Sequence, residues 1–151
     1  ELSILKSADY PFTHLCYCME MKADPIDIPY HGKVTLTELK LAFNQRFPYL
    51  KWEFFYPHHS PNKASSKKEL ITTNPEIEQL NPHIQIGSLQ FTAETTVKEL
   101  EELVWNQFGL AIQVFRKSGD MWLETTITDQ WSLGFQNEQG QELSEQLDRK
   151  N

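Results

Sequence analysis

The chain has 151 residues, a length typical of one domain that can bury its own core. Hydrophobic residues make up 39% of it and the net charge is −7, which indicates a folding protein and argues against nucleic-acid binding, because phosphate contacts need a basic face. No apolar run approaches the roughly 18 residues of a membrane helix, so we expect no membrane partner.

The amino-terminal segment lacks the strand-like and helix-like spacing of apolar residues that the rest of the chain shows. We expect residues 1–22 to be a flexible appendage and a single α+β domain to span residues 23–140. Cys16 and Cys18 are poorly placed to bridge each other, which favours a reducing, cytoplasmic location. His14 adds a third possible metal ligand nearby, but the usual zinc spacing is wider and a second pair is missing. The sequence therefore indicates no cofactor.

The pattern of residues 26–55 returns in residues 87–115. Each copy opens and closes with apolar residues that alternate with polar ones, which is typical of half-buried strands. The alternating apolar residues are Ile28, Tyr30, Leu89 and Phe91 in the opening strands, and Trp52, Phe54, Ile112 and Val114 in the closing strands.

A helix is predicted between the two strands of each copy. A capping box opens each helix, formed by Thr35 with Glu38 in the first copy and by Thr96 with Glu99 in the second. An apolar stripe follows at helical spacing, and the second stripe lies 61 positions after the first. The stripes are Leu36, Leu39, Phe43 and Phe47 in the first helix, and Val97, Leu100, Val104 and Phe108 in the second.

The repeat predicts the fold class. Pro48 ends the first helix and Gly109 the second, so each copy is a strand–helix–strand unit. Two such units in tandem predict an α+β fold of the ferredoxin-like sandwich type, in which both helices cover one face of a four-stranded sheet. The alternative is a β-grasp arrangement of the second half, with the first half docked beside it.

Residues 57–82 separate the two copies and carry four prolines, which predicts a long loop with one helical turn at 76–80. The elements that follow the second copy are marked by turn and capping residues. In chain order they are a tight turn at 117–120, a hairpin strand at 121–126, a short helix at 130–137 capped by Thr128 or Asp129 and ended by Gly140, and a polar tail at 141–151.

The chain from Phe108 to Trp131 contains the segments FGL, QVFRKSG, WLETT and TD, the last followed one residue later by Trp131. In this pattern it resembles a small uncharacterised bacterial protein family. The resemblance implies no activity, and it favours a bacterial cytoplasmic origin.

Aromatic and cationic residues near the closing strands are the candidates for binding. If one sheet face is uncovered, the aromatic residues would line part of it, and exposed aromatic residues mark binding surfaces. The cationic residues lie at a turn, where they would hold an anion or a partner's carboxylate. The candidate binding residues are Phe55, Tyr56, Phe115, Arg116, Lys117 and Trp122.

His58 and His59 are candidates for a metal site or for acid–base chemistry, with His31 or His83 brought near by folding. A group of acids and hydroxyls downstream is better explained by strand propensity and helix capping, so no catalytic residue is predicted. Its members are Glu124, Thr125, Thr126, Thr128 and Asp129.

We therefore expect a non-enzymatic interaction module that binds a protein partner or forms a homodimer through a sheet face. The sequence contains no dinucleotide fingerprint, P-loop, zinc-protease motif or nucleophile elbow. One alternative is a small enzyme or metal-binding protein centred on His58 and His59. The other is a regulatory domain that binds a small ligand.

Overall fold

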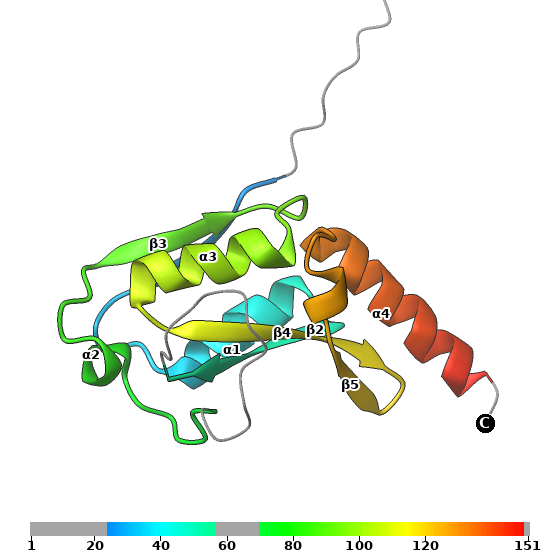
Figure 1. Ribbon diagram of the computed structural model, residues 1–151, viewed down its shortest axis with the longest axis horizontal. Helices are drawn as coiled ribbons and strands as arrows, with labels where there is room; N and C mark the ends of the chain where they lie inside the picture. Colours follow the sequence, from blue (N-terminus) through cyan, green and yellow to red (C-terminus); the bar gives the residue numbers. More distant parts are fainter. Residues whose placement is uncertain (1–23, 57–69, 150–151) are drawn as a thin grey trace, which may run out of the picture.

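The computed structural model describes residues 24–56 and 70–149, so the predicted appendage at 1–22 lies outside the described residues. Helices and antiparallel strands combine in it, which confirms the α+β class (Figure 1). In chain order the elements are β1 (Ile26–Tyr30), α1 (Leu36–Arg46), β2 (Leu50–Phe55), α2 (Ile77–Leu80), β3 (Gly87–Phe91), α3 (Val97–Phe108), β4 (Ala111–Ser118), β5 (Met121–Glu124), the short 3-10 helix η2 (Thr126–Thr128) and α4 (Leu133–Asp148).

Both predicted capping boxes are confirmed. The backbone N–H of Thr35 donates to the Glu38 carboxylate at 2.8 Å, and that of Thr96 donates to Glu99 at 2.8 Å. These hydrogen bonds hold the pKa of each glutamate below its usual value, because they favour the ionised carboxylate. Gly109 ends α3 in the left-handed conformation, with a φ of 67°, as its predicted capping role requires.

The strands form two sheets. β1 pairs with β3, and β4 lies between β2 and β5, all antiparallel. The ferredoxin-like detail is not confirmed, because that fold needs one four-stranded sheet and here the two strands of each unit lie in different sheets. The β-grasp alternative meets the same difficulty, since β3 pairs with β1 of the first unit. Each of these four strands pairs with the equivalent strand of the other unit and not with the other strand of its own unit.

Each of these pairs is centred on equivalent residues of the repeat. Ile28 lies opposite Leu89, 61 positions later, and Glu53 lies opposite Gln113, 60 positions later. Antiparallel pairing of equivalent strands is what a two-fold axis generates, as in a symmetric dimer. The two units are therefore related by an approximate two-fold axis, which supports a structural duplication.

The repeat also extends beyond the strand–helix–strand unit. The N–H of Ile77, at the start of α2, donates to the carbonyl of Val34 at 2.9 Å. The N–H of Leu133, at the start of α4, donates at 2.9 Å to the carbonyl of Thr95, which is the equivalent of Val34. α2 and α4 are thus the same element of the two units, and α2 is the helical turn predicted near residues 76–80.

The outer edges of β2 and β4 are extended in the same way. Leu70 pairs with Phe55 at the edge of β2, as Glu124 of β5 pairs with Phe115 in β4. The chain from Leu70 therefore takes the place in the first unit that β5 takes in the second. The part of the predicted loop at 57–69 lies outside the described residues.

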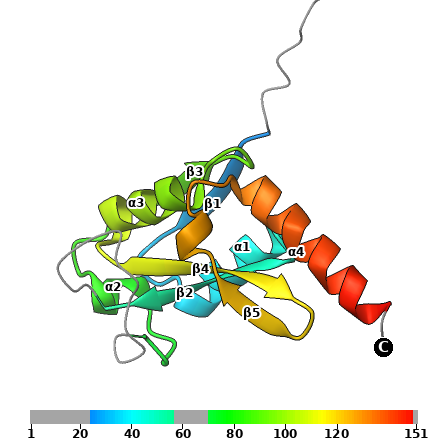
Figure 2. The ribbon, with the colours of Figure 1, turned by 45° about the vertical axis from the view of Figure 1, so that its right-hand side comes forward.

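One core joins both units. The β1–β3 pair and the β2–β4 pair lie on opposite sides of it, and α1 and α3 complete it (Figures 1 and 2). Phe43 of α1 stacks on Trp52 of β2 with ring centres 4.6 Å apart and lies 6.5 Å from Phe91 of β3. The apolar stripes of both helices are buried, as predicted, so neither unit has a core of its own.

The start of α4 lies later in the chain than expected. Ser132 is its N-cap, with a hydroxyl that accepts from the N–H of Phe135 at 3.2 Å. Thr128 and Asp129, the predicted caps, belong to the turn before it. This turn also serves α3, because the carbonyl of Asp129 accepts from the N–H of Lys98 at 2.9 Å.

The predicted end of this helix at Gly140 is wrong, because α4 runs on to Asp148 and residues 141–148 continue it. A Cβ at Gly140 would lie 2.8 Å from the Cβ of Tyr49, 3.0 Å from the Tyr49 carbonyl oxygen and 3.2 Å from Cγ of Arg116. The glycine is therefore explained by close contact between α4 and the sheet. None of the described helices is long and apolar enough to cross a membrane.

Candidate functional site

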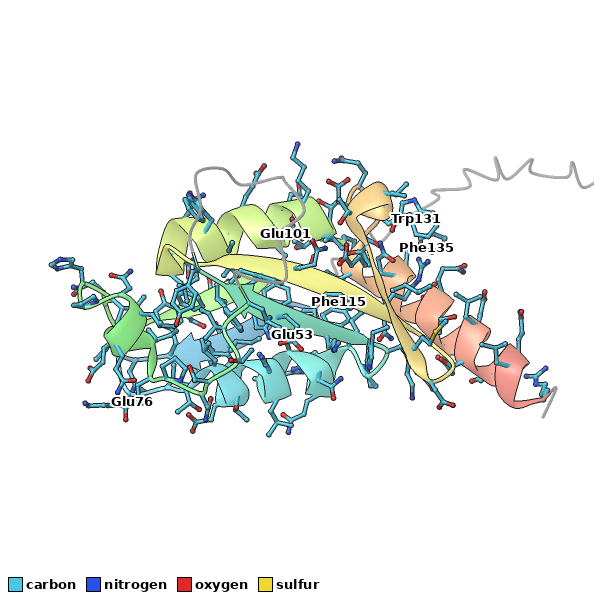
Figure 3. The ribbon with its side chains drawn as sticks, turned by 60° about the horizontal axis from the view of Figure 1, so that its bottom comes forward. Glu53, Glu76, Glu101, Phe115, Trp131 and Phe135 are labelled. Atoms are coloured by element: carbon cyan, nitrogen blue, oxygen red, sulfur yellow. The ribbon has the colours of Figure 1, made fainter. Side chains whose placement is uncertain are left out.

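The predicted binding residues lie on different faces of the β2–β4–β5 sheet. Lys117 of β4 pairs with Trp122 of β5, and Phe115 precedes Lys117 by two residues, so all three point to the face away from the core. We call this the outer face, and Figure 3 shows Phe115 on it with Glu53 nearby. Arg116 lies between Phe115 and Lys117 in β4, so its side chain points to the face opposite the outer face.

A cation covers the two rings of the outer face. Nζ of Lys51 lies 5.2 Å from the ring centre of Phe115 and 5.1 Å from that of Trp122. Lys51 also lies 3.4 Å from Glu53, which in turn pairs with Lys40 of α1 at 2.5 Å. Cation–π contacts at such sites contribute about 0.5–1 kcal/mol. These aromatic residues are thus held in a charged network within the fold.

Phe55 and Tyr56 differ in accessibility. Phe55 is 5% exposed at the end of β2, whereas Tyr56 is 47% exposed directly after it. Phe55 therefore offers little surface for a partner. Tyr56 is the equivalent of Arg116 in the repeat, since the closing strands are offset by 60 positions.

Arg116 reaches toward the start of α4. Its Nη1 donates to Oε1 of Gln136 at 2.8 Å, and its guanidinium lies 5.5 Å from the ring centre of Trp131. Gln136 is fully buried, and its amide nitrogen donates to the carbonyl and hydroxyl oxygens of Thr128, each at 2.8 Å. Nε of Arg116 is buried, and it has no hydrogen-bond partner among residues 24–56 and 70–149. The guanidinium is thus held at Nη1, and its buried Nε is unpaired within the described residues.

Exposed apolar side chains occur on β5, on η2 and at the start of α4, the elements near this arginine. The rings of Trp131 and Phe135 lie 4.8 Å apart at the start of α4 and are 37% and 43% exposed (Figure 3). Leu123, opposite Arg116 in the sheet, is 37% exposed, and Ile127 in η2 is 99% exposed. We call these five residues the Arg116 surface.

Sequence reasoning found Arg116 but missed most of this surface. Trp131 is 37% exposed, although Leu133, two residues later, is fully buried. The available signal was a tryptophan directly before the N-cap Ser132 and a phenylalanine in the first turn of the helix, since apolar residues that flank a helix start can pack together. Their proximity to Arg116 depends on how α4 packs.

Glu101 of α3 is a further residue that the sequence did not single out (Figure 3). Burial raises its pKa to about 7, and the negative charge of Asp129 adds to this, while a hydrogen bond from the N–H of Val114 opposes it. The equivalent residue in the first unit is Lys40, which pairs with a carboxylate. Glu101 therefore places a carboxyl with a pKa near neutral between α3 and β4.

Two threonines of the acid and hydroxyl group downstream have structural roles. The hydroxyl of Thr125 donates to the carbonyl of Val114 at 2.9 Å, and that of Thr128 donates to the carbonyl of Thr125 at 3.2 Å. These bonds hold the turn that leads from β5 to α4. The group therefore gives no support to a catalytic site.

His58 and His59, like the earlier group of His14, Cys16 and Cys18, lie outside the described residues. Within residues 24–56 and 70–149, no three histidine, cysteine or acidic side chains gather as a metal site would require. The metal-centred alternative stays a prediction.

No protein-family model, no curated protein and no solved structure matches this chain.

Proposed function

We propose that this chain is a non-enzymatic interaction module that binds another protein through the Arg116 surface. Nine large hydrophobic side chains are strongly exposed in the described residues, and six of them lie between residues 121 and 147. Exposed apolar side chains in contact with each other, such as the rings of Trp131 and Phe135, are typical of protein interfaces. The six are Met121, Leu123, Ile127, Trp131, Phe135 and Leu147.

The residue types at the centre of this surface support a protein partner. Tryptophan and arginine are enriched among the residues that carry most of the energy of protein interfaces. The guanidinium of Arg116 lies over the Trp131 ring, 5.5 Å from the ring centre, and this contact restricts both side chains before a partner arrives, which lowers the entropic cost of binding. A net charge of −7 disfavours nucleic acid as the partner.

Selection from a displayed library of random twelve-residue peptides tests this proposal. We expect peptides selected on the wild-type chain to bind the Trp131→Ala/Phe135→Ala double variant at least about tenfold more weakly, since two anchors are removed. The matched control is Leu41→Ala/Ile86→Ala, which removes two exposed apolar side chains elsewhere. A selection without enriched peptides, or peptides that bind both double variants equally, would contradict the proposal.

Self-association through the outer face is the second candidate function. The charged residues of that face are Lys51, Glu53, Lys117 and Glu124, so its charges cancel although the whole chain carries −7. Two copies would repel each other least at this face, and the alternating charges would pair across a two-fold axis.

Light scattering on the eluting protein tests the second candidate. We expect a mass of twice 17.7 kDa at high concentration, and about half of that mass for Lys51→Glu, which places like charges across the axis. Lys98→Glu on α3 is the matched control with the same change in charge and should remain a dimer. A strict monomer at every concentration would rule this candidate out.

A further inference from the structure

The exposed side of α4 continues the Arg116 surface. Phe135, Glu138 and Glu142 recur at helical spacing, so they lie on one side of the helix, and all three are exposed. Phe135 begins this side, with its ring centre 4.8 Å from that of Trp131, and α4 runs away from the two rings in Figure 3. The opposite side of α4 packs on the domain, and its buried residues are Leu133, Gln136, Gly140 and Ser144.

Most of the negative charge of the chain lies in this region. Between residues 119 and 149 there are seven acidic residues and one basic residue, which give a net charge of −6 out of the −7 of the whole chain. The acidic residues are Asp120, Glu124, Asp129, Glu138, Glu142, Glu145 and Asp148, and the basic residue is Arg149. The exposed apolar side chains therefore lie in an acidic part of the protein.

Glu138 and Glu142 have no cation partner within the described residues. Among the ion pairs found there, Glu145 is the only acid of α4, and it pairs with Arg149 at 3.5 Å. Oε2 of Glu142 accepts a hydrogen bond from the amide nitrogen of Gln139 at 3.0 Å, which provides no compensating charge. Two exposed carboxylates beside the aromatic rings are thus available to a cation from another molecule.

The stability of α4 does not explain where these acids lie. α1 and α3 each have a glutamate in the first turn, Glu38 and Glu99, where the helix dipole favours negative charge. α4 has no acid in its first turn and no base in its last turn. Like charges four residues apart, as at Glu138 and Glu142, destabilise a helix. A contact with another molecule explains their position better.

The first unit of the repeat lacks these features. α2, the equivalent of α4, has four residues and ends before the positions that correspond to Glu138 and Glu142. The residues that correspond to the two aromatic rings are Pro75 and Gln79. The capping boxes, in contrast, are present in both units. The rings and the acids thus occur together in the second unit alone, and the repeated fold does not require them.

We propose that the partner protein binds through a basic amphipathic segment. Its apolar residues pack on Trp131 and Phe135, and its lysine or arginine side chains pair with Glu138 and Glu142. This rests on the proposed protein-binding function and names the chemistry of the partner. The negative field of the region attracts such a segment and repels an acidic one. Arg116, the nearby cation, is half-buried beside Trp131, so it opposes a basic partner less than the two exposed carboxylates attract it.

The peptides selected on the wild-type chain provide the probe. At low salt we expect them to combine apolar residues with lysine or arginine, and to bind the Glu138→Gln/Glu142→Gln variant about tenfold more weakly. In about 1 M salt the screening length falls to about 3 Å, so the two proteins should bind these peptides nearly equally. Both substitutions are at exposed positions, so the variant should keep its fold.

The matched control is Glu76→Gln/Glu78→Gln, which makes the same change in net charge at α2. α2 lies at the other end of the molecule from α4, as Figures 1 and 3 show, and its two glutamates pair with Lys33 at the surface. We expect this variant to bind the peptides as the wild type does.

A change in the peptide gives a second readout. Replacing its basic residue by glutamine should weaken binding to the wild type about tenfold, and it leaves the folding of the protein untouched. The same replacement should have little further effect on binding to Glu138→Gln/Glu142→Gln, because the cation has already lost its partners there.

The outcomes separate the two proposals. Peptides that need Trp131 and Phe135 but carry no basic residue, or that tolerate its replacement by glutamine, would overturn the basic-partner inference and leave the protein-binding function standing. An equal loss of binding for the two glutamine double variants would also overturn it, because the overall charge and not the α4 carboxylates would then be the cause. An absence of peptides that depend on the two rings would contradict the function itself.

Discussion

At pH 8, replacing Glu101 by glutamine is expected to stabilise the fold by about 1–3 kcal/mol. Glu101 has a usual pKa of 4.5 that burial and the charge of Asp129 raise to about 7, so its ionised form is disfavoured in the folded state. The upper value is the full ionisation penalty for such a shift, and the lower value allows for partial exposure to solvent. Glutamine keeps an oxygen that can accept from the N–H of Val114.

The sign of the pH dependence follows from proton binding. Between about pH 4.5 and pH 7, the folded state holds the proton of Glu101 more tightly than the unfolded chain does. The free energy of unfolding therefore falls as the pH rises through this window, and the loss is complete above it. Near pH 4.5 the Glu101→Gln variant and the wild type should be almost equally stable.

Urea unfolding of both proteins at pH 4.5, 6 and 8 measures this difference. Glu94→Gln, at an exposed position, is the matched control and should change stability little at any of these values. Asp129→Asn should lower the pKa of Glu101 relative to the wild type, because one repelling charge is removed, so less stability should be lost between pH 4.5 and pH 8. A stability gain for Glu101→Gln that is the same at all three values would show that ionisation is not its cause.

Replacing Gly140 by alanine is expected to destabilise the fold by about 1–3 kcal/mol, although alanine is the better helix former. The added Cβ would lie 2.8 Å from the Cβ of Tyr49 and 3.0 Å from its carbonyl oxygen. Because the second of these is backbone, α4 must move away from the sheet. That movement would loosen the contact between Gln136 and Arg116 as well.

Thermal or urea unfolding of Gly140→Ala checks this result. Alanine at Gln146, an exposed position on the same helix, is the control and should change stability by no more than about 0.5 kcal/mol. If Gly140→Ala were instead more stable than the wild type, helix propensity would outweigh packing, and α4 would not be held closely against the sheet.

The local elements of this protein could be predicted from its sequence. Capping boxes act within four residues, as the bonds between Thr35 and Glu38 show, and buried helix faces follow from the spacing of their apolar residues. The hairpin of β4 and β5 follows from the turn at Gly119, which adopts a φ of 59°. Such features depend on near neighbours in the chain, so the sequence contains them directly.

The boundaries of α4 were harder to predict because two signals pointed to the wrong residues. Gly140 resembles a helix end, yet it is required where α4 lies against Tyr49. Asp129 resembles a helix cap, yet its carbonyl accepts from the start of α3. In both cases a contact with a segment far away in the chain determines the role of the residue.

The sequence by itself determined the α+β class, the duplicated unit, and α1 and α3 with their capping boxes, because these depend on spacing and short-range hydrogen bonds. Only the tertiary structure decided that equivalent strands pair across the repeat, that Arg116 faces α4 while Lys117 faces outward, and that Glu101 is partly buried near Asp129. Strand pairing and burial are set by packing between segments about 60 residues apart, and periodicity along the chain does not specify which segments meet.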